Sequence, residues 1–204
     1  RNLGQSTAAL NKSLERLSSG LRINKAADDA AGLAIAEGFS SQVRGSRVAQ
    51  RNAQDGISLV QTAEGALSET TNILQRVREL AVQASNGTQS TKNRAALDTE
   101  VQQLLAQVDD IAIDTEFNGI SVLSSSQTVT LQSGANPSQT LNVVVNGAKT
   151  GDLGISSVAV SSMQLAVSAI STIDRALQSV STLRSNLGAY QNRLEFTINT
   201  LSIQ

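Results

Sequence analysis

The sequence predicts a mainly α fold: an elongated antiparallel helical rod with a long helix, a second helix and a returning C-terminal helix, and a small β-hairpin region at one end. One observation behind this prediction is an apolar repeat of seven residues near the C-terminus, formed by Ile173, Val180, Leu187, Leu194 and Leu201. A second is a similar repeat within residues 30–115, and a third is an alternation of apolar and polar residues within 128–145. A seven-residue repeat makes a seam that only another helix can cover, whereas alternation is typical of a strand.

Residues 1–29 are expected to form a terminal helix and a connecting segment. Leu3, Leu10 and Leu17 repeat by seven and need a partner helix. The helix should end near Gly20 or Asn24, because glycine and small polar residues favour turns. Since the C-terminal repeat is still running at the last residue, both ends are interpreted as parts of longer helices.

A long helix is predicted from about residue 30 to residue 85. Asp28 and Asp29 offer an N-cap and negative charge for its first turn. Its apolar columns include Leu67 and Leu74, and 56 residues at 1.5 Å per residue would span roughly 80 Å.

Five glycines within this helix leave two interpretations open: Gly32, Gly38, Gly45, Gly56 and Gly65. Each costs about 1 kcal/mol relative to alanine in a helix interior. Either one or two of them mark kinks or breaks, or they allow neighbouring backbones to approach closely. The small residues around Gly56 predict that a partner comes closest there.

A second helix should start near Ser90 or Thr91, after a stop at Asn86 and Gly87. Its seam follows the spacing 4, 3, 4 with Leu97, Val101, Leu104 and Val108. Because the loop before it is short, it should lie antiparallel to the long helix, and together they account for residues 30–115.

Residues 116–155 are predicted to form a β-hairpin tip, and residues 156–204 the returning helix of the rod. Residues 128–132 and 141–145 have strand character, and the stretch between them contains Gly134 and Pro137. The expected path goes out along helices, turns through this tip and returns along a helix.

Composition argues against an enzyme. The chain has no His, Cys or Trp, which removes the common nucleophile pairs and the His- and thiolate-based metal sites, and no cofactor is expected. The acidic residues Asp109, Asp110, Asp114 and Glu116 could hold a metal or act in acid/base chemistry, although a solvated helix face is the favoured interpretation. A net charge of −1 without a basic block argues against nucleic acid, and no apolar run is long enough for a membrane.

Several stretches resemble bacterial flagellins. They are RLSSGLRIN at 16–24, DDAAGLAI at 28–35, RNAQDGIS at 51–58, TAEGAL at 62–67, QRVRELAVQ at 75–83, FNG at 117–119 and LRSNLGAYQNRL at 183–194. The likeness covers nearly the whole chain in register and is weakest over residues 124–170. The chain is similar to a short flagellin without the variable outer domains and trimmed at both termini.

This resemblance implies a structural subunit of the bacterial flagellar filament, secreted and extracellular, that polymerises through helix–helix packing for motility. The implied partners are other flagellin subunits, flagellar export and capping proteins, and the vertebrate flagellin-sensing Toll-like receptor. An alternative is a surface binding module for a receptor or glycan, although the low aromatic content argues against a glycan site.

The family's receptor surface maps onto four positions: Arg76, Leu80, Gln83 and Glu100. Spacings of four and three place the first three on one helix face. Leu104 departs from the family pattern, because well-recognised flagellins can carry a basic residue there. The alternative is that Leu80 belongs to the core and that Arg76 is a solvated charge paired with Glu79 or Glu100.

Overall fold

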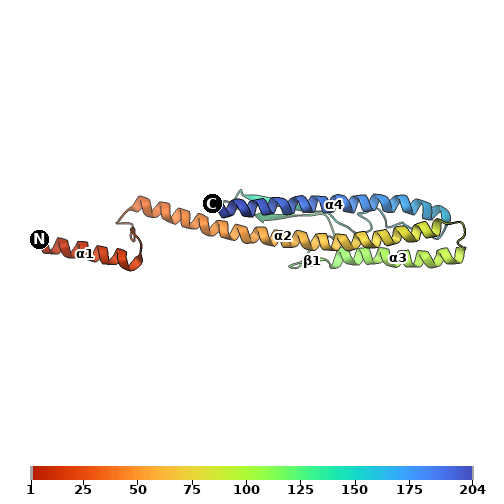
Figure 1. The fold of residues 1–204 in the computed structure, drawn as a ribbon, viewed down its shortest axis with the longest axis horizontal. Helices are drawn as coiled ribbons and strands as arrows, with labels where there is room; N and C mark the ends of the chain where they lie inside the picture. The colour runs from red at the N-terminus through yellow and green to blue at the C-terminus, as the bar shows by residue number, and fades with distance from the viewer. Residues whose placement is uncertain (1, 204) are drawn as a thin grey trace.

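The computed structural model describes residues 2–203, which form a long helical rod with a shorter helix projecting from one end (Figure 1). The helices and strands are α1 (Asn2–Ser19), α2 (Ala30–Ser85), α3 (Thr91–Asp114), β1 (Glu116–Phe117), β2 (Ile120–Ser121), β3 (Gln127–Gln132), β4 (Thr140–Val145) and α4 (Met163–Ile203). The predicted mainly α class and antiparallel rod are confirmed. Arg1 and Gln204, the outer limits of the predicted terminal segments, lie outside the described residues.

The connector between α1 and α2 folds back along α1. Gly20 ends α1 in the left-handed region, with φ of 69°, as glycine after a helix commonly does. Lys12 Nζ lies 2.5 Å from Asp28 Oδ1, and Lys25 Nζ lies 2.8 Å from Glu15 Oε1. These polar contacts hold the connector against α1, whose leucines do not belong to the apolar core.

Helix α2 is continuous from Ala30 to Ser85, so none of its five glycines breaks it. It starts where Asp29, with extended backbone, accepts a hydrogen bond from the amide of Gly32 at 2.9 Å. Its length exceeds what propensity alone sustains, so its stability comes from packing.

Two of these glycines admit close neighbours from the same chain. A Cβ at Gly56 would collide with the side chain of Leu131 on β3 and approach that of Leu194 on α4. A Cβ at Gly45 would lie 2.9 Å from the Cβ of Ala135. Neighbours do approach α2 closely at Gly56, where a partner was predicted, and they are the β3–β4 hairpin and α4.

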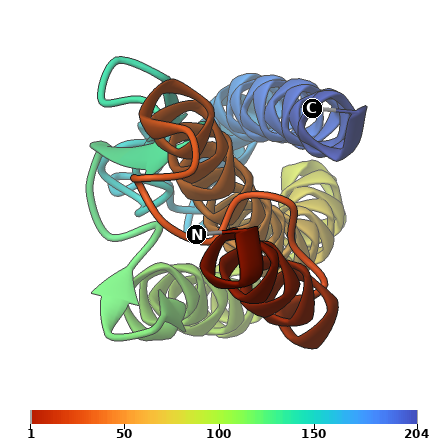
Figure 2. The same cartoon turned by 90° about the vertical axis from the view of Figure 1, so that its left-hand side faces the viewer.

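Helix α3 runs antiparallel to the second half of α2. Ser90 caps its N-terminus, and Arg94 fastens the turn by donating to the carbonyl oxygens of Ala84 and Asn86 at 2.8 and 3.0 Å. The core of the rod combines seams from α2, α3 and α4 (Figure 2).

Most of the predicted seam residues lie in this core. Those that are buried are Leu67, Leu74, Val101, Val108, Ile173, Val180, Leu187 and Leu194. Leu97 and Leu104 are only partly buried, and Leu105 lies deeper than Leu104. A spacing of four and three fits either leucine. Leu105 lies deeper because it shares a helix face with Asp98 and Gln102, which bind the segment before α4.

The hairpin lies along the rod instead of forming a tip at which the chain turns. Strands β3 and β4 are antiparallel, with Val129 opposite Val143, and β4 alternates between exposed and buried residues. Asn52 Nδ2 of α2 donates to the carbonyl oxygen of Gln132 at 3.2 Å, beside the contact at Gly56. Because a two-stranded sheet is marginal alone, its apolar face must be covered by helices, and the side of the rod provides them.

The chain reaches α4 through an irregular segment, residues 146–162, held by polar side chains of α3. Asp98 accepts a hydrogen bond from the amide of Val160 at 2.6 Å, and Gln102 donates to the carbonyl oxygen of Val158 at 2.9 Å. Helix α4 then returns antiparallel to α2 and ends beside the first part of that helix (Figure 1).

Candidate functional site

The described residues offer surfaces rather than a chemical site. No group of three or more metal-binding side chains is found among residues 2–203. Within the same range, no helix is both long and apolar enough to cross a bilayer. The candidate sites are therefore the helix faces and grooves of the rod.

The predicted receptor face carries a charged cluster between α2 and α3. Arg76 donates to Glu100 from Nη2 at 2.8 Å and from Nε at 3.2 Å, and to Glu79 from Nη1 at 3.2 Å. The hydrogen bonds from Arg76 to Glu100, more than those to Glu79, raise the pKa of Arg76 above its ordinary value. Arg76 and Glu100 stay about half exposed, and Gln83 is exposed as well. The structure therefore brings Arg76 and Glu100 together and leaves them accessible.

Leu80 does not lie on that surface, so its assignment as a direct contact residue is wrong for this chain. Its side chain is 1% exposed and belongs to the core with Val77 and Ala81. The position falls on the inner side of α2 because it lies three residues after Val77 and four before Ala84, which are both buried.

The acidic residues at the end of α3 differ in their exposure and in their hydrogen bonds. Both carboxylate oxygens of Asp109 accept hydrogen bonds from Thr150, one from its amide at 2.8 Å and one from its hydroxyl at 2.9 Å. Asp110 and Asp114 are exposed, and no described residue forms an ion pair with them. They line a groove of about 290 Å³ together with Gly65, Ala66, Glu69, Gln107, Ile111 and Thr115. Asp109 thus holds the irregular segment, while its two neighbours face solvent.

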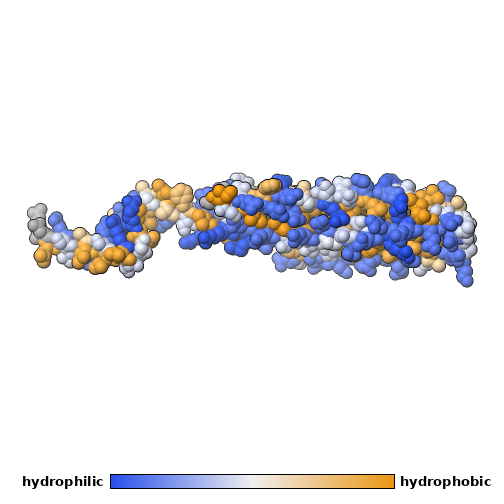
Figure 3. Space-filling view, viewed as in Figure 1, coloured by the Kyte–Doolittle hydropathy of each residue, from blue (hydrophilic) through white to orange (hydrophobic). Residues whose placement is uncertain are grey.

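Exposed apolar residues gather on α1 and the first part of α2, which project beyond the end of α4 (Figure 3). On α1, Leu3 is 85% exposed, and Leu10, Leu14 and Leu17 are each more than half exposed. On α2, Ile35 and Phe39 are more than half exposed as well. The predicted leucine seam of residues 1–29 therefore exists and has no cover within the described chain.

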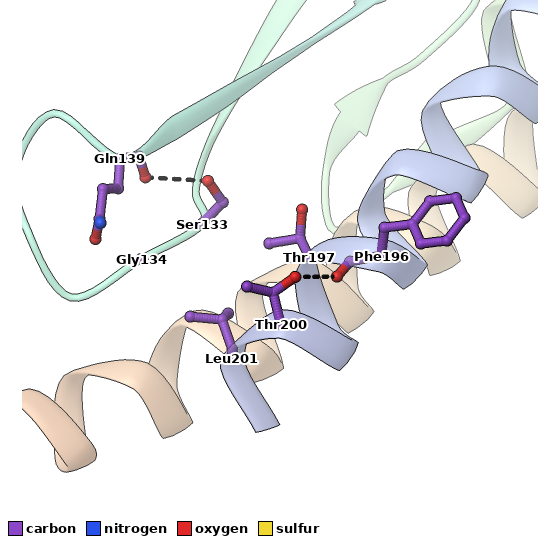
Figure 4. Close-up of a pocket in the computed structure, with 7 residues that line it drawn as sticks. All are labelled: Ser133, Gly134, Gln139, Phe196, Thr197, Thr200 and Leu201. Carbon is purple, nitrogen blue, oxygen red and sulfur yellow. Dashed lines mark hydrogen bonds between the residues drawn. The ribbon is translucent and has the colours of Figure 1, made fainter. Parts of the chain in front are cut away.

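A second groove, of about 400 Å³, separates the hairpin turn from the end of α4 (Figure 4). Ser133, Gly134 and Gln139 line one side, and Phe196, Thr197, Thr200 and Leu201 line the other. Ser133 donates to the carbonyl oxygen of Gln139 at 3.1 Å, so the turn closes on itself. None of these seven residues is titratable, and the groove has no means to perform acid/base chemistry.

The chain matches two family models: the bacterial flagellin N-terminal helical region over residues 1–128, and the bacterial flagellin C-terminal helical region over residues 170–204. The unmatched part, residues 129–169, includes most of the hairpin and the irregular segment.

Curated relatives and solved structures agree with these matches. Flagellin of Salmonella muenchen is 49% identical over 154 residues, which are 76% of this chain and 30% of the relative. Phase 1 flagellin of Salmonella naestved gives the same values, so the chain spans about a third of the length of these relatives.

Among solved structures, Bacillus cereus flagellin superposes with a TM-score of 0.64 at 32% identity, covering 74% of this chain and 88% of that one. A putative flagellar hook-associated protein from Vibrio parahaemolyticus shares the fold alone, with a TM-score of 0.70 at 11% identity over 87% of this chain and 94% of that one. The family models together cover most of the sequence, and this chain belongs to the bacterial flagellin family.

Proposed function

We propose that the protein is a structural subunit of the bacterial flagellar filament, acting outside the cell and performing no catalysis. The observation that carries the proposal is the leucine stripe of α1, with Leu3, Leu10, Leu14 and Leu17 all exposed. A seven-residue apolar repeat without a cover is a surface for helix–helix packing. In a family of flagellins, the cover would come from helices of the assembled filament.

Other copies of the same protein are the first partners under this proposal. Export proteins that deliver the chain and capping proteins that place it in the filament are further proposed partners, by likeness to the family. The absence of cysteine from the sequence supports export of an unfolded chain, because residues 1–204 can form no disulfide that would hinder it.

Electron microscopy of the full-length protein tests this function. Wild-type protein should form filaments, and a Leu10→Glu, Leu14→Glu variant should not, because charges would replace the apolar seam. Asn11→Glu, which adds a charge to the same helix outside the leucine column, serves as the control and should still assemble. A wild-type protein that forms no filaments would contradict the proposal.

We also propose that the flagellin-sensing Toll-like receptor engages the face formed by Arg76, Gln83 and Glu100, with Leu80 supporting that face from beneath. Exposed arginine is a frequent anchor of protein interfaces. Arg76→Ala should therefore weaken receptor binding by more than about 1 kcal/mol without changing helix content. Arg175→Ala, an exposed arginine on α4, is the matched control. Equal binding by wild type and Arg76→Ala would rule this face out.

A further inference from the structure

Asparagine followed by glycine is a chemically reactive pair, and the sequence contains three such pairs. Their asparagines are Asn86, Asn118 and Asn146. The backbone nitrogen of the glycine can attack the side-chain carbonyl carbon of the asparagine, because glycine has no Cβ to obstruct the approach. The reaction needs no enzyme, and asparagine is among the residues that heat degrades. What distinguishes the three pairs in the folded protein is their surroundings.

Asn118 and Gly119 form the exposed two-residue turn between β1 and β2. Both have positive φ, 51° and 75°, as in the tight hairpin turn for which Asn-Gly is the favoured pair. The polar contacts around this turn come from Thr115, Ser121 and Gln127, so within the described residues neither the Asn118 side chain nor the Gly119 amide has a hydrogen-bond partner. Both reacting groups are therefore available.

The strands that hold this turn are too short to protect it. They pair over two residues each, Glu116 with Ser121 and Phe117 with Ile120. A two-stranded sheet is marginally stable even with longer strands, so this turn opens at little cost in free energy. Opening lets the Asn118 side chain rotate toward the following amide, which is the movement that ring closure requires.

Asn86 is exposed but held at three of its atoms. Its side-chain Oδ1 accepts a hydrogen bond from the amide of Thr88 at 3.1 Å, and its backbone oxygen accepts one from Arg94 Nη2 at 3.0 Å. Its own amide donates to the carbonyl oxygen of Gln83 at 3.3 Å. Ring closure has to break the first of these bonds and turn a backbone that the other two hold.

Gly147, which follows Asn146, is buried. Its amide donates to the hydroxyl of Ser126 at 3.4 Å, and a Cβ at this position would collide with the side chain of Asp152. Since the amide nitrogen is the attacking atom, this packing must open before Asn146 can react. Of the three pairs, only that of Asn118 combines exposure with two unengaged groups.

We propose that Asn118 is a site of spontaneous deamidation, which reacts faster in the folded protein than Asn86 and Asn146. The Gly119 nitrogen forms a bond to Cγ of Asn118, and the side-chain amide leaves as ammonia, taking the proton of that nitrogen. Water then opens the cyclic imide. Cleavage at Cγ leaves aspartate, whereas cleavage at the backbone carbonyl carbon leaves isoaspartate, in which the chain runs through the side chain. Either product adds one negative charge to a chain of net charge −1.

Isoaspartate lengthens the backbone of the turn by one carbon atom. Two-residue turns fit the twist of their strands closely, so the longer turn breaks the pairing of β1 with β2. That pairing lies beside Phe117, which packs against the core, and beside the hydrogen bond from the Val122 amide to the Thr115 carbonyl oxygen at 3.0 Å. The modification therefore loosens the end of α3, and it does so whether or not the chain is assembled.

Ageing of the full-length protein in mildly alkaline buffer tests the site, because alkaline pH favours loss of the amide proton. Peptic digestion at acid pH avoids deamidation during the digest, and tandem mass spectrometry then measures conversion at each asparagine. Asn118 should convert at least about tenfold faster than Asn86 and Asn146 in the folded protein, and in guanidinium chloride the three rates should become similar. Faster conversion of Asn86 or Asn146, or a tenfold difference that persists in guanidinium chloride, would overturn the proposal.

Asn118→Gly is the matched variant, because glycine tolerates the positive φ and lacks the reacting side chain. Aged wild-type protein should give more acidic forms on anion exchange, and the aged variant should not. Hydrogen exchange over residues 115–122 should be faster in aged than in fresh wild-type protein, with residues 55–82 unchanged. Equal amounts of acidic forms from the variant would place the reaction elsewhere, and unchanged exchange over residues 115–122 in isoaspartate-containing protein would refute the loosening of α3.

Discussion

Gly56 on α2 and Leu131 on β3 are packed so closely that no side chain fits between them. Leu194 of α4 also packs against Gly56, so α2, β3 and α4 meet at this glycine. Beside it, Asn52 ties α2 to the carbonyl oxygen of Gln132. The hairpin is therefore seated on the rod by a steric fit and a hydrogen bond at the same level.

Replacing Gly56 and Gly65 by alanine should have opposite effects on stability. Gly65→Ala should raise the free energy of unfolding by up to about 1 kcal/mol, because alanine is the better helix former and its Cβ meets nothing. Gly56→Ala should lower it by about 1 kcal/mol, because overpacking against Leu131 outweighs the same gain. Urea unfolding followed by circular dichroism measures both, and equal stabilisation by the two substitutions would argue against the packing at Gly56.

Asp109→Ala should destabilise the protein by about 1–3 kcal/mol, because it leaves the amide and hydroxyl of the buried Thr150 without a partner. Asp110→Ala, one residue further along, should change stability by less than about 0.5 kcal/mol. Chemical denaturation of the pair provides the comparison. If both variants behave alike, Asp109 does not fasten the irregular segment.

Amide hydrogen exchange should be faster throughout α1 than in residues 55–82. The leucines of α1 are all more than half exposed in the single chain and belong to no core, whereas residues 55–82 lie along the core. Mass spectrometry of the monomer after exchange would measure this directly. Equal protection of α1 and residues 55–82 in a sample shown to be monomeric would contradict this prediction, because it would mean that α1 packs against the rest of the chain.

The connector before α2 should loosen in acid. The hydrogen bond from Lys12 lowers the pKa of Asp28 below its ordinary value of 3.8. A carboxylate whose pKa is lower in the folded protein stabilises the folded connector fully at pH values above 3.8. This contribution is lost as the pH falls through the lowered pKa. Lys25 and Glu15 are the other charged groups of the cluster.

NMR titration of the Asp28 carboxyl checks this, with Lys12→Met as the matched variant. Removing the ammonium should return the pKa of Asp28 toward 3.8, and a titration unaffected by the substitution would show that Lys12 does not hold it.

Periodicity predicted the helices of this fold well because each buries one face against a neighbour. The seven-residue columns placed Leu67, Leu74 and Leu187 in the core, and the N-cap Asp29 was readable from its position before the apolar repeat. The same signal could not separate Leu104 from Leu105, since one residue changes the direction of a side chain by only about 100° and α3 is covered on two sides.

Other features carry no periodic signal at all. Asp98, Gln102 and Asp109 bind backbone groups of residues far along the chain, and nothing in the local sequence distinguishes them from solvated polar residues. Alternation identified the hairpin strands but not the surface on which they lie. That position depends on Gly45 and Gly56, whose role is visible only once Ala135 and Leu131 are in place.

The antiparallel pairing of α2 with α4 has a consequence for the order of folding. Gln50 donates to Ser202, which is 152 residues further along the chain, and Arg78 donates to Asp174, which is 96 residues further. Contacts between such distant residues carry a large loop-closure cost and form slowly, whereas the turn between α2 and α3 closes locally. A chain synthesised from its N-terminus can therefore complete its core only after α4 has been made. Until then, the face of α2 that α4 covers in the folded protein lacks its partner.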